Sequence, residues 1–100
     1  MRADLSIVIA SCRDRNTEKA AAGIRVRKFE AIARAAQLKL LGLRIAGRLE
    51  DLAAPPGNRL EALKGDRKGQ HSIRINDQYR VCFKWKEGAA HDVEIADYHS

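Results

Sequence analysis

The sequence predicts an α+β fold in which an N-terminal strand and two helices pack on a twisted, mainly antiparallel sheet of four to five strands. Two observations predict this class. Residues 26–43 carry apolar side chains at the three- and four-residue steps of an amphipathic helix, whereas the second half of the chain alternates apolar and polar residues between turn signals. With 100 residues and 45% hydrophobic content, the chain builds one core, so residues 1–100 are expected to form a single domain.

The first half opens with a strand and continues into helices. Residues 6–11 (SIVIAS) are rich in β-branched side chains and predict the first strand. Either Asp14 or Asn16 is placed to cap a short helix that stops at Gly23. The long amphipathic helix follows from Val26, and its predicted core residues are Phe29, Ile32, Ala33, Ala36, Leu40 and Leu43.

Proline and glycine mark the change from helices to strands. A further helical turn through Leu49 and Leu52 is expected, and the Pro-Pro-Gly-Asn run at residues 55–58 then excludes helix and predicts a loop. Four extended runs follow as successive antiparallel strands, over residues 59–63, 71–75, 79–85 and 92–98. Turn signals separate them at residues 64–69, 76–77 and 87–88.

Alternation along residues 79–86 divides this strand between two faces. The set expected to build the core is Tyr79, Val81, Phe83 and Trp85, and the opposite set is Arg80, Cys82, Lys84 and Lys86. A sheet face that carries Arg80 and Lys84 suits a phosphate-binding floor, and a solvated outer face is the ordinary alternative.

The charge distribution favours a polyanionic partner. The formal net charge is +6 and the pI is about 9.7. Residues 59–86 hold eight Lys and Arg against three acidic residues, whereas the last fourteen residues hold four acidic residues and no Lys or Arg. The chain is therefore basic over residues 59–86 and acidic over its last predicted strand.

Other features narrow the function classes. Cys12 and Cys82 lie far apart, without CxxC or histidine partners at ligand spacing, so reduced thiols are expected rather than a zinc site or a disulfide framework. The apolar run at residues 5–10 is much shorter than a membrane span, and nothing around it resembles a cleaved signal. We expect a cytoplasmic protein with no membrane association, no metal and no cofactor.

Three segments carry a resemblance to a known family. They are residues 55–70 (PPGNRLEALKGDRKGQ), residues 72–83 (SIRINDQYRVCF) and residues 97–99 (DYH). Together they resemble the HigB branch of the RelE/ParE toxins. The resemblance runs from about Ile7 to the end of the chain and leaves residues 1–6 as an N-terminal extension.

The resemblance implies a small toxin with a RelE-like fold, from a type II toxin–antitoxin system. It implies an endoribonuclease that works in the 70S ribosome and cleaves messenger RNA during translation, without a metal ion. It further implies a HigA-like helix-turn-helix antitoxin, encoded beside the toxin, that holds it inactive and through which alone it reaches operator DNA. The alternatives are a ParE-like toxin that binds a protein such as DNA gyrase without enzymatic activity, and a transcriptional co-factor that does no harm when expressed alone.

Cleavage of RNA without a metal requires a base for the 2′-hydroxyl, cations for the phosphorane and an acid for the leaving oxygen. The candidate catalytic residues are Glu61, Lys64, Arg80, Asp97, Tyr98 and His99, and the candidate RNA-binding residues are Arg67, Lys68, Arg74 and Lys84. The resemblance implies that Lys64 and Arg80 contact the scissile phosphate. Arg80 is expected to stabilise the transition state, with a cross-strand ion pair to Glu61 or Asp97 as its structural alternative.

The general base stays open among Glu61, Asp97 and His99. An unperturbed histidine titrates near pH 6.5, so His99 can give or take a proton at neutral pH, and Asp97 can orient it or act as base itself. Tyr98 is expected to stack on a base unless Lys64 or Arg80 lowers its pKa. Glu61 departs from the family pattern, in which a histidine is expected at this place, and a carboxylate is the weaker proton donor there.

Overall fold

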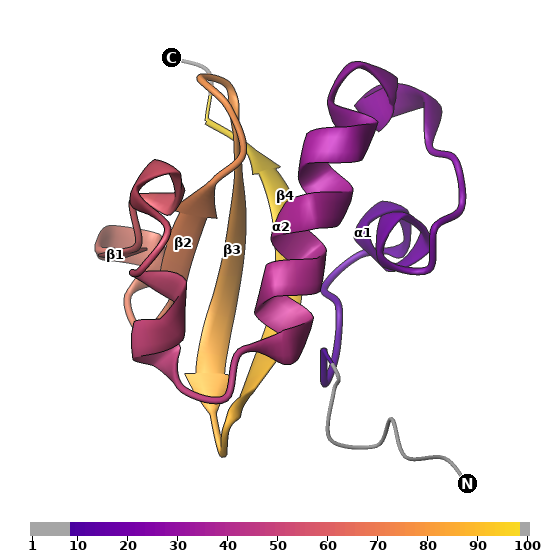
Figure 1. Cartoon of the computed structure of the whole chain (residues 1–100). Helices are drawn as coiled ribbons and strands as arrows, with labels where there is room; N and C mark the ends of the chain where they lie inside the picture. Colours follow the sequence, from indigo (N-terminus) through magenta and orange to yellow (C-terminus); the bar gives the residue numbers. More distant parts are fainter. Residues whose placement is uncertain (1–8, 99–100) are drawn as a thin grey trace, which may run out of the picture.

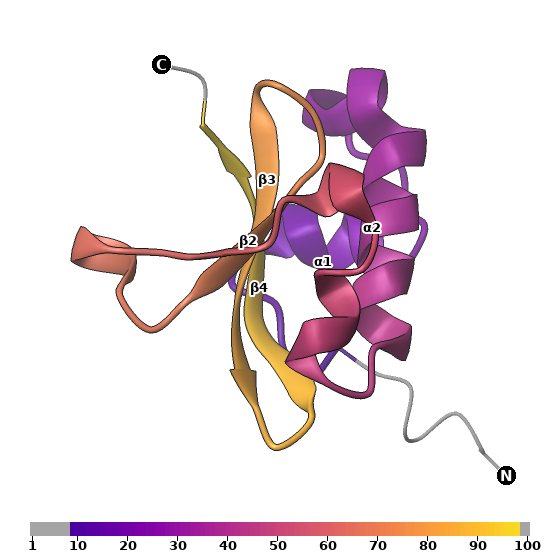
Figure 2. The same cartoon turned by 60° about the vertical axis from the view of Figure 1, so that its left-hand side comes forward.

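The computed structural model describes residues 9–98, and it shows helices packed against one face of a four-stranded antiparallel sheet (Figure 1). The strands adjoin in chain order: β1 Glu61–Ala62, β2 His71–Arg74, β3 Tyr79–Lys86 and β4 Ala89–Asp97. Helices α1 (Arg15–Ala21) and α2 (Ala33–Ile45) lie on the same side of this sheet (Figure 2). The predicted α+β class is confirmed. No helix within residues 9–98 has the length and apolar character needed to cross a membrane.

The expected first strand over residues 6–11 lies partly outside the described residues. Its described end runs beside β4, where Ile9 and Cys12 form isolated parallel bridges with Ala90 and Val93. The amide of Ala10 donates to the carbonyl of Ala90 at 2.8 Å. This segment therefore extends the sheet at the β4 edge by a short parallel stretch, which agrees with a mainly antiparallel sheet.

Asp14 is the residue that caps α1. Its carboxylate accepts from the Thr17 amide at 3.1 Å and from the Thr17 hydroxyl at 2.7 Å. The same hydroxyl accepts from the amide of Ile95 at 3.0 Å and so joins the helix to β4. Gly23 follows the helix with φ of 81°, the left-handed conformation that glycine adopts without strain. Of the two caps that the sequence permits, the structure uses Asp14.

The long helix begins later than its periodicity predicts. Residues Arg27–Ile32 wind as a 3₁₀ helix, and the α-helix starts only at Ala33. A 3₁₀ helix places residues three apart on one side, and Phe29 and Ile32 are both buried by this winding. Ala33 is exposed, so its predicted core role is wrong. The other predicted core positions are buried, namely Phe29, Ile32, Ala36, Leu40 and Leu43.

Short 3₁₀ turns also replace two expected features. The predicted turn through residues 49 and 52 is the 3₁₀ helix Leu49–Leu52, and the predicted loop at 55–58 contains the 3₁₀ turn Pro56–Asn58. Proline is tolerated there because the first amides of a helix need no partner within it. Arg59 then has a left-handed backbone, with φ of 46°, which interrupts extended structure. The strand expected over residues 59–63 is therefore only Glu61–Ala62.

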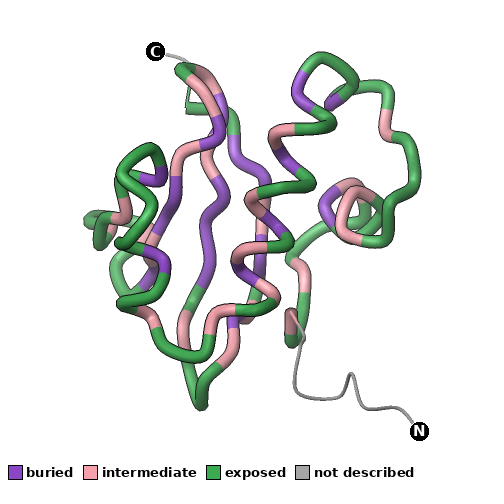
Figure 3. Tube along the Cα trace, in the orientation of Figure 1, coloured by how far each residue is buried: buried purple, intermediate pink, exposed green. Residues whose placement is uncertain are grey.

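The sheet buries the apolar face of β3 against the helices. Ile73, Val81, Phe83 and Val93 have no exposed surface, and the burial map shows that the buried positions concentrate where α2 faces the sheet (Figure 3). Glu87 and Gly88 both have positive φ, and this two-residue turn carries the chain directly from β3 into β4. The fourth strand therefore starts at Ala89, earlier than the predicted residue 92.

Candidate functional site

The sheet face turned away from α1 and α2, which we call the open face, carries a row of polar side chains. Residues in register across an antiparallel sheet point to the same side. Glu61 pairs with Ser72, Ser72 with Cys82, and Cys82 with Glu94. In the neighbouring row Arg80 lies between Arg74 and Ala96. The topology therefore gathers side chains from all four strands on one surface.

Arg80 is held firmly on the open face. Its Nε donates to Ser72 Oγ at 2.7 Å, and its Nη2 donates to the backbone carbonyl of Arg59 at 2.7 Å. Nη2 also lies 3.2 Å from Glu61 Oε1, and the Arg80 side chain is only 13% exposed. The ion pair considered as a structural alternative is therefore present, with Glu61 as the partner. The carbonyl that Arg80 binds belongs to Arg59, the residue with the left-handed backbone.

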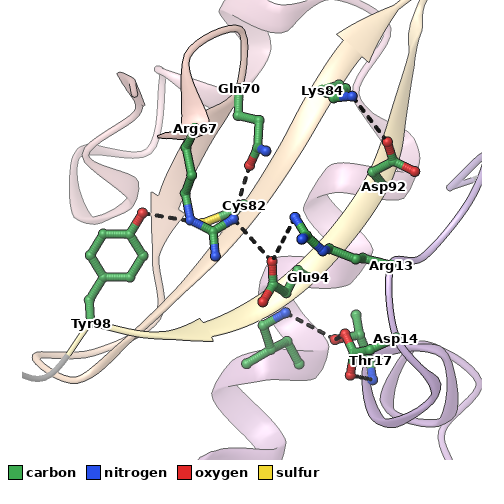
Figure 4. Close-up of polar contacts among 11 residues, drawn as sticks. Arg13, Asp14, Thr17, Arg67, Gln70, Cys82, Lys84, Asp92, Glu94 and Tyr98 are labelled. Atoms are coloured by element: carbon green, nitrogen blue, oxygen red, sulfur yellow. Dashed lines mark hydrogen bonds and ion pairs between the residues drawn. The ribbon is translucent and has the colours of Figure 1, made fainter. Parts of the chain in front are cut away.

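Arg67 lies over the middle of the open face rather than at a solvated loop tip. It ends the 3₁₀ turn Gly65–Arg67, and its Nη1 lies 3.0 Å from Glu94 Oε1 and 3.1 Å from Gln70 Oε1. Arg13 approaches the same Glu94 oxygen at 3.8 Å. Figure 4 shows the two guanidinium groups converging on this carboxylate. Cys82, which has no exposed surface, lies next to Arg67 in the same view.

Tyr98 meets Cys82 beside these cations. The thiol donates to the phenolic oxygen at 3.7 Å, and Tyr98 remains 39% exposed (Figure 4). Burial raises the pKa of Cys82 and is the largest influence on it, ahead of the hydrogen bond with Tyr98, which lowers this pKa. Burial likewise raises the pKa of Tyr98, followed by the bond to Cys82, and Arg67 and Arg80 oppose this rise more weakly. Both groups are therefore neutral at pH 7.

Asp97 lies beside Tyr98 in the sequence but has a different position in the sheet. It pairs in register with Tyr79, a core-facing residue, whereas Tyr98 faces the open side with Cys82. The Asp97 carboxylate accepts from the side-chain amide of Gln78 at 3.1 Å. The successive residues Asp97 and Tyr98 thus point to opposite sides of the sheet end. His99 lies outside the described residues, so the structure does not test the predicted convergence of all three side chains.

The remaining predicted cations lie around the open face at varied depths. Lys64 and Lys68 are exposed on either side of the 3₁₀ turn Gly65–Arg67. Lys84 lies 3.4 Å from Asp92, and Arg74 forms an ion pair with Asp77. Hydrogen bonds of their side chains hold Arg80 and Arg67 on the open face, on which Tyr98 also contacts Cys82.

Sequence reasoning missed Glu94, Gln70 and Ser72. Alternation along β4 does put Glu94 on the same face as Cys82, which is the signal that was present in the sequence. Gln70 carries no comparable signal, because its contact depends on how the preceding loop folds.

Within residues 9–98, no group of three or more His, Cys, Asp and Glu residues could hold a metal ion. The arrangement presents two positioned guanidinium groups and a neutral phenol, which suits binding of a phosphodiester and its adjoining base.

Comparison with known proteins relates the chain to bacterial toxins. Residues 16–99 match a family described as RelE-like toxin of type II toxin-antitoxin system HigB. Toxin HigB-1 of Vibrio cholerae is 58% identical over 40 residues, which cover 40% of this chain and 42% of that protein. An uncharacterized protein of Haemophilus influenzae is 36% identical over 52 residues, covering 52% of this chain and 50% of that one. The matched region thus spans about half the length of these curated relatives.

A solved structure shares the fold. The YoeB-YefM complex from Staphylococcus aureus contains a chain that superposes with a TM-score of 0.54. The superposition covers 93% of this chain and 99% of that chain, with 16% sequence identity. At this identity the likeness concerns the fold alone.

Proposed function

This chain belongs to the RelE-like HigB toxins of type II toxin–antitoxin systems, and we propose that it cleaves messenger RNA on the ribosome, without a metal ion, at its open face. Toxins of the RelE-like family are in general endoribonucleases. The observation that carries the proposal is that Arg80 and Arg67, each held by side-chain bonds, and Tyr98, which contacts Cys82, share the sheet face that the helices leave uncovered.

Arg80 is the group best placed to stabilise the transition state. Attack of the 2′-hydroxyl on phosphorus forms the new P–O bond as the bond to the 5′-oxygen breaks, and negative charge builds on the non-bridging oxygens. The bonds from Arg80 to Ser72 and to the Arg59 carbonyl hold its guanidinium before substrate arrives. Little reorganisation is then needed when the charge develops, which is the source of the catalytic advantage.

Glu61 is the carboxylate best placed to act as general base. It lies 3.2 Å from Arg80 and its side chain is 59% exposed, so a phosphate oxygen can replace it as the partner of Arg80. The displaced carboxylate then remains beside the bound nucleotide, where it accepts the proton of the 2′-hydroxyl. Asp97 faces the other side of the sheet end, which supports Glu61 over Asp97 for this step.

Tyr98 and the surrounding cations bind the strand. The neutral phenol of Tyr98 stacks on a nucleotide base, since burial opposes its ionisation. Lys64 contacts the scissile phosphate together with Arg80. Arg67, Lys68, Arg74 and Lys84 supply further contacts to RNA, and each such contact weakens with added salt. His99 donates the proton to the leaving oxygen in this scheme.

The partners follow from the same scheme. The toxin acts in the cytoplasm on the 70S ribosome and its messenger RNA, and a HigA-like helix-turn-helix antitoxin holds it inactive. Operator DNA is reached only through that antitoxin. The net charge of +6 supports association with ribosomal RNA. The structural neighbour from Staphylococcus aureus is itself a YoeB-YefM complex, which supports a protein partner of this kind.

The test is cleavage of a defined messenger RNA by the purified chain, with and without programmed 70S ribosomes. We expect cleavage only on the ribosome, products ending in a 2′,3′-cyclic phosphate, and no cleavage when the nucleotide at the cut is 2′-deoxy. Products with a 5′-phosphate would instead indicate attack by water. If the folded chain stops growth without cutting RNA, the protein is a toxin that acts by binding, which is the ParE-like alternative.

A further inference from the structure

The outward face of α2 carries an exposed apolar stripe. Leu38, Leu41 and Ile45 are 62%, 47% and 61% exposed, and their spacing of three and four residues puts them on one side of the helix. The core-facing residues Ala36, Leu40 and Leu43 occupy the opposite side. Single exposed apolar residues are ordinary on a protein surface, but a helix that is apolar on both sides indicates a partner on the second one.

A groove between α1 and α2 adjoins this stripe. The two helices lie side by side (Figure 1), and a hollow of about 610 Å³ lies between them. Residues 20–23 supply its floor with three alanines and a glycine, and Leu38 and Leu41 form its wall. A second hollow of about 220 Å³ continues past Gly23 toward Ile24 and Phe29. We call the two hollows and the stripe the helical groove, and its small floor residues allow close approach of a partner.

The charges around the helical groove define the chemistry of that partner. Arg34 and Arg44 are the charged residues in the lining of the larger hollow, which includes no carboxylate. The lining of the smaller hollow adds Arg25 and Glu30, which form an ion pair with each other and so leave the arginines of the larger hollow as the excess charge. Arg44 also donates to the carbonyl of Ala21 at 2.8 Å, so its positive charge is fixed at the groove wall. A second copy of this chain would bring like charges together, and a nucleic acid would leave the leucines unpaired. An occupant with aliphatic side chains and flanking carboxylates satisfies both requirements.

We infer that the helical groove binds an acidic amphipathic helix of the antitoxin, with aliphatic residues against Leu38, Leu41 and Ile45 and carboxylates against Arg34 and Arg44. This inference rests on the proposed function, which supplies the antitoxin as partner. Helices α1 and α2, whose residues line the larger hollow, lie on the side of the sheet opposite to the open face (Figure 2). Substitutions in the groove therefore change antitoxin affinity and leave the RNA-cleaving surface intact.

The experiment measures binding of the purified antitoxin, expressed from the reading frame beside this one, to the full chain and three variants. The double variant Leu38→Asp/Leu41→Asp should weaken binding by about 30-fold or more, as for central interface residues. Arg34→Glu should weaken it by roughly tenfold, with less effect at high salt. Arg15→Glu is the matched control, because Arg15 is also exposed but lies at the start of α1, outside the lining of the larger hollow. This variant should bind the antitoxin with the affinity of the wild type.

Each outcome decides between stated alternatives. All variants should keep the far-ultraviolet spectrum and the ribosome-dependent cleavage of the wild type, which separates the groove from the open face. Wild-type affinity in both groove variants would overturn the inference while the antitoxin remains a partner. No binding by the wild type would overturn it together with the antitoxin part of the proposed function. A dimer of the chain alone that Leu38→Asp/Leu41→Asp dissociates would make a second copy the occupant.

Discussion

The guanidinium of Arg67 and the carboxylate of Glu94 lie 3.0 Å apart across the open face and join the 3₁₀ turn Gly65–Arg67 to β4. Gln70 accepts a second bond from the same nitrogen of Arg67 at 3.1 Å. A cation in a connecting loop would otherwise move with that loop. Glu94 therefore acts as a positioning residue for Arg67, close to Tyr98 and to the surface on which we propose that RNA binds.

Replacing Glu94 with glutamine should distinguish its role in positioning Arg67 from its contribution to the stability of the fold. Each partner of this ion pair is about a quarter exposed, so the free energy of unfolding should fall by only about 0.5–1 kcal/mol. The cleavage KM should rise several-fold, because Arg67 is no longer held for RNA contact, whereas kcat should change little. Urea unfolding and ribosome-dependent cleavage measure the two effects. The matched control is Glu30→Gln, which removes an ion pair with Arg25 on the helical side and should leave KM unchanged.

Tyr98 should act through its ring rather than through ionisation. Because burial raises its pKa, the phenol stays protonated across the neutral range, and the cleavage rate should show no rise from Tyr98 between pH 7 and 9. Tyr98→Phe should retain most activity, whereas Tyr98→Ala should lose roughly 10- to 100-fold, the amount that stacking on one base contributes. Equal losses in the two variants would assign the chemistry to the hydroxyl instead. Single-turnover cleavage over this pH range provides the measurement.

The hydroxyl of Thr17 links the cap of α1 to the sheet, so its removal should destabilise the fold. Thr17→Val leaves the buried amide of Ile95 without this acceptor, at a cost of about 1–3 kcal/mol. Asp14→Ala removes the cap and the bond from the Thr17 hydroxyl but leaves the acceptor for Ile95, and it should cost about 1 kcal/mol. Thr17→Ser keeps the hydroxyl and serves as control. Chemical denaturation at pH 7 checks the order, and a Thr17→Val variant as stable as Thr17→Ser would contradict it.

Two cysteines should make the fold sensitive to alkaline pH. Burial raises the pKa of Cys12 and of Cys82 in the folded chain, so the folded state disfavours the thiolate. The resulting stability is fully present below the ordinary thiol pKa of about 8.5 and is lost as the pH rises through the higher folded value. Urea unfolding at successive pH values should show this decline above about pH 8.5. A Cys12→Ala/Cys82→Ala variant should show a shallower decline, and an identical slope would exclude the thiols as its cause.

Local patterns predicted most of the fold, and the exceptions share a physical cause. Apolar periodicity located α2 and its buried residues, and strand alternation located the core face of β3. The 3₁₀ winding of Arg27–Ile32 was not predicted, because burial of Phe29 and Ile32 at a three-residue step is compatible with either kind of helix. The left-handed backbone at Arg59 was missed for a different reason. It accompanies a contact with Arg80, twenty-one residues away, that no local pattern reports.

The sequence suggested residues for the candidate site, and the structure shows how those within residues 9–98 are arranged. Alternation correctly separated Arg80 and Cys82 from the core residues of β3. The tripeptide at residues 97–99 suggested three converging groups, and this stays a prediction because His99 lies outside the described residues; of the other two, Asp97 pairs with Tyr79 and Tyr98 contacts Cys82. Arg67 was predicted as a loop contact, and its bond to Glu94 across the sheet could not be found without knowing how that loop folds.

The most direct test of the open face as an RNA-cleaving site is the single-turnover cleavage rate of Arg80→Lys and Arg80→Ala on programmed ribosomes. Loss of a strong transition-state donor costs about 2.7–4 kcal/mol, so Arg80→Ala should fall by about 100- to 1,000-fold. Arg80→Lys keeps the charge but lacks the planar fork and should remain well below wild type. Arg34→Ala, across the sheet, is the control. Wild-type rates from folded Arg80 variants would contradict the assignment of catalysis to this face.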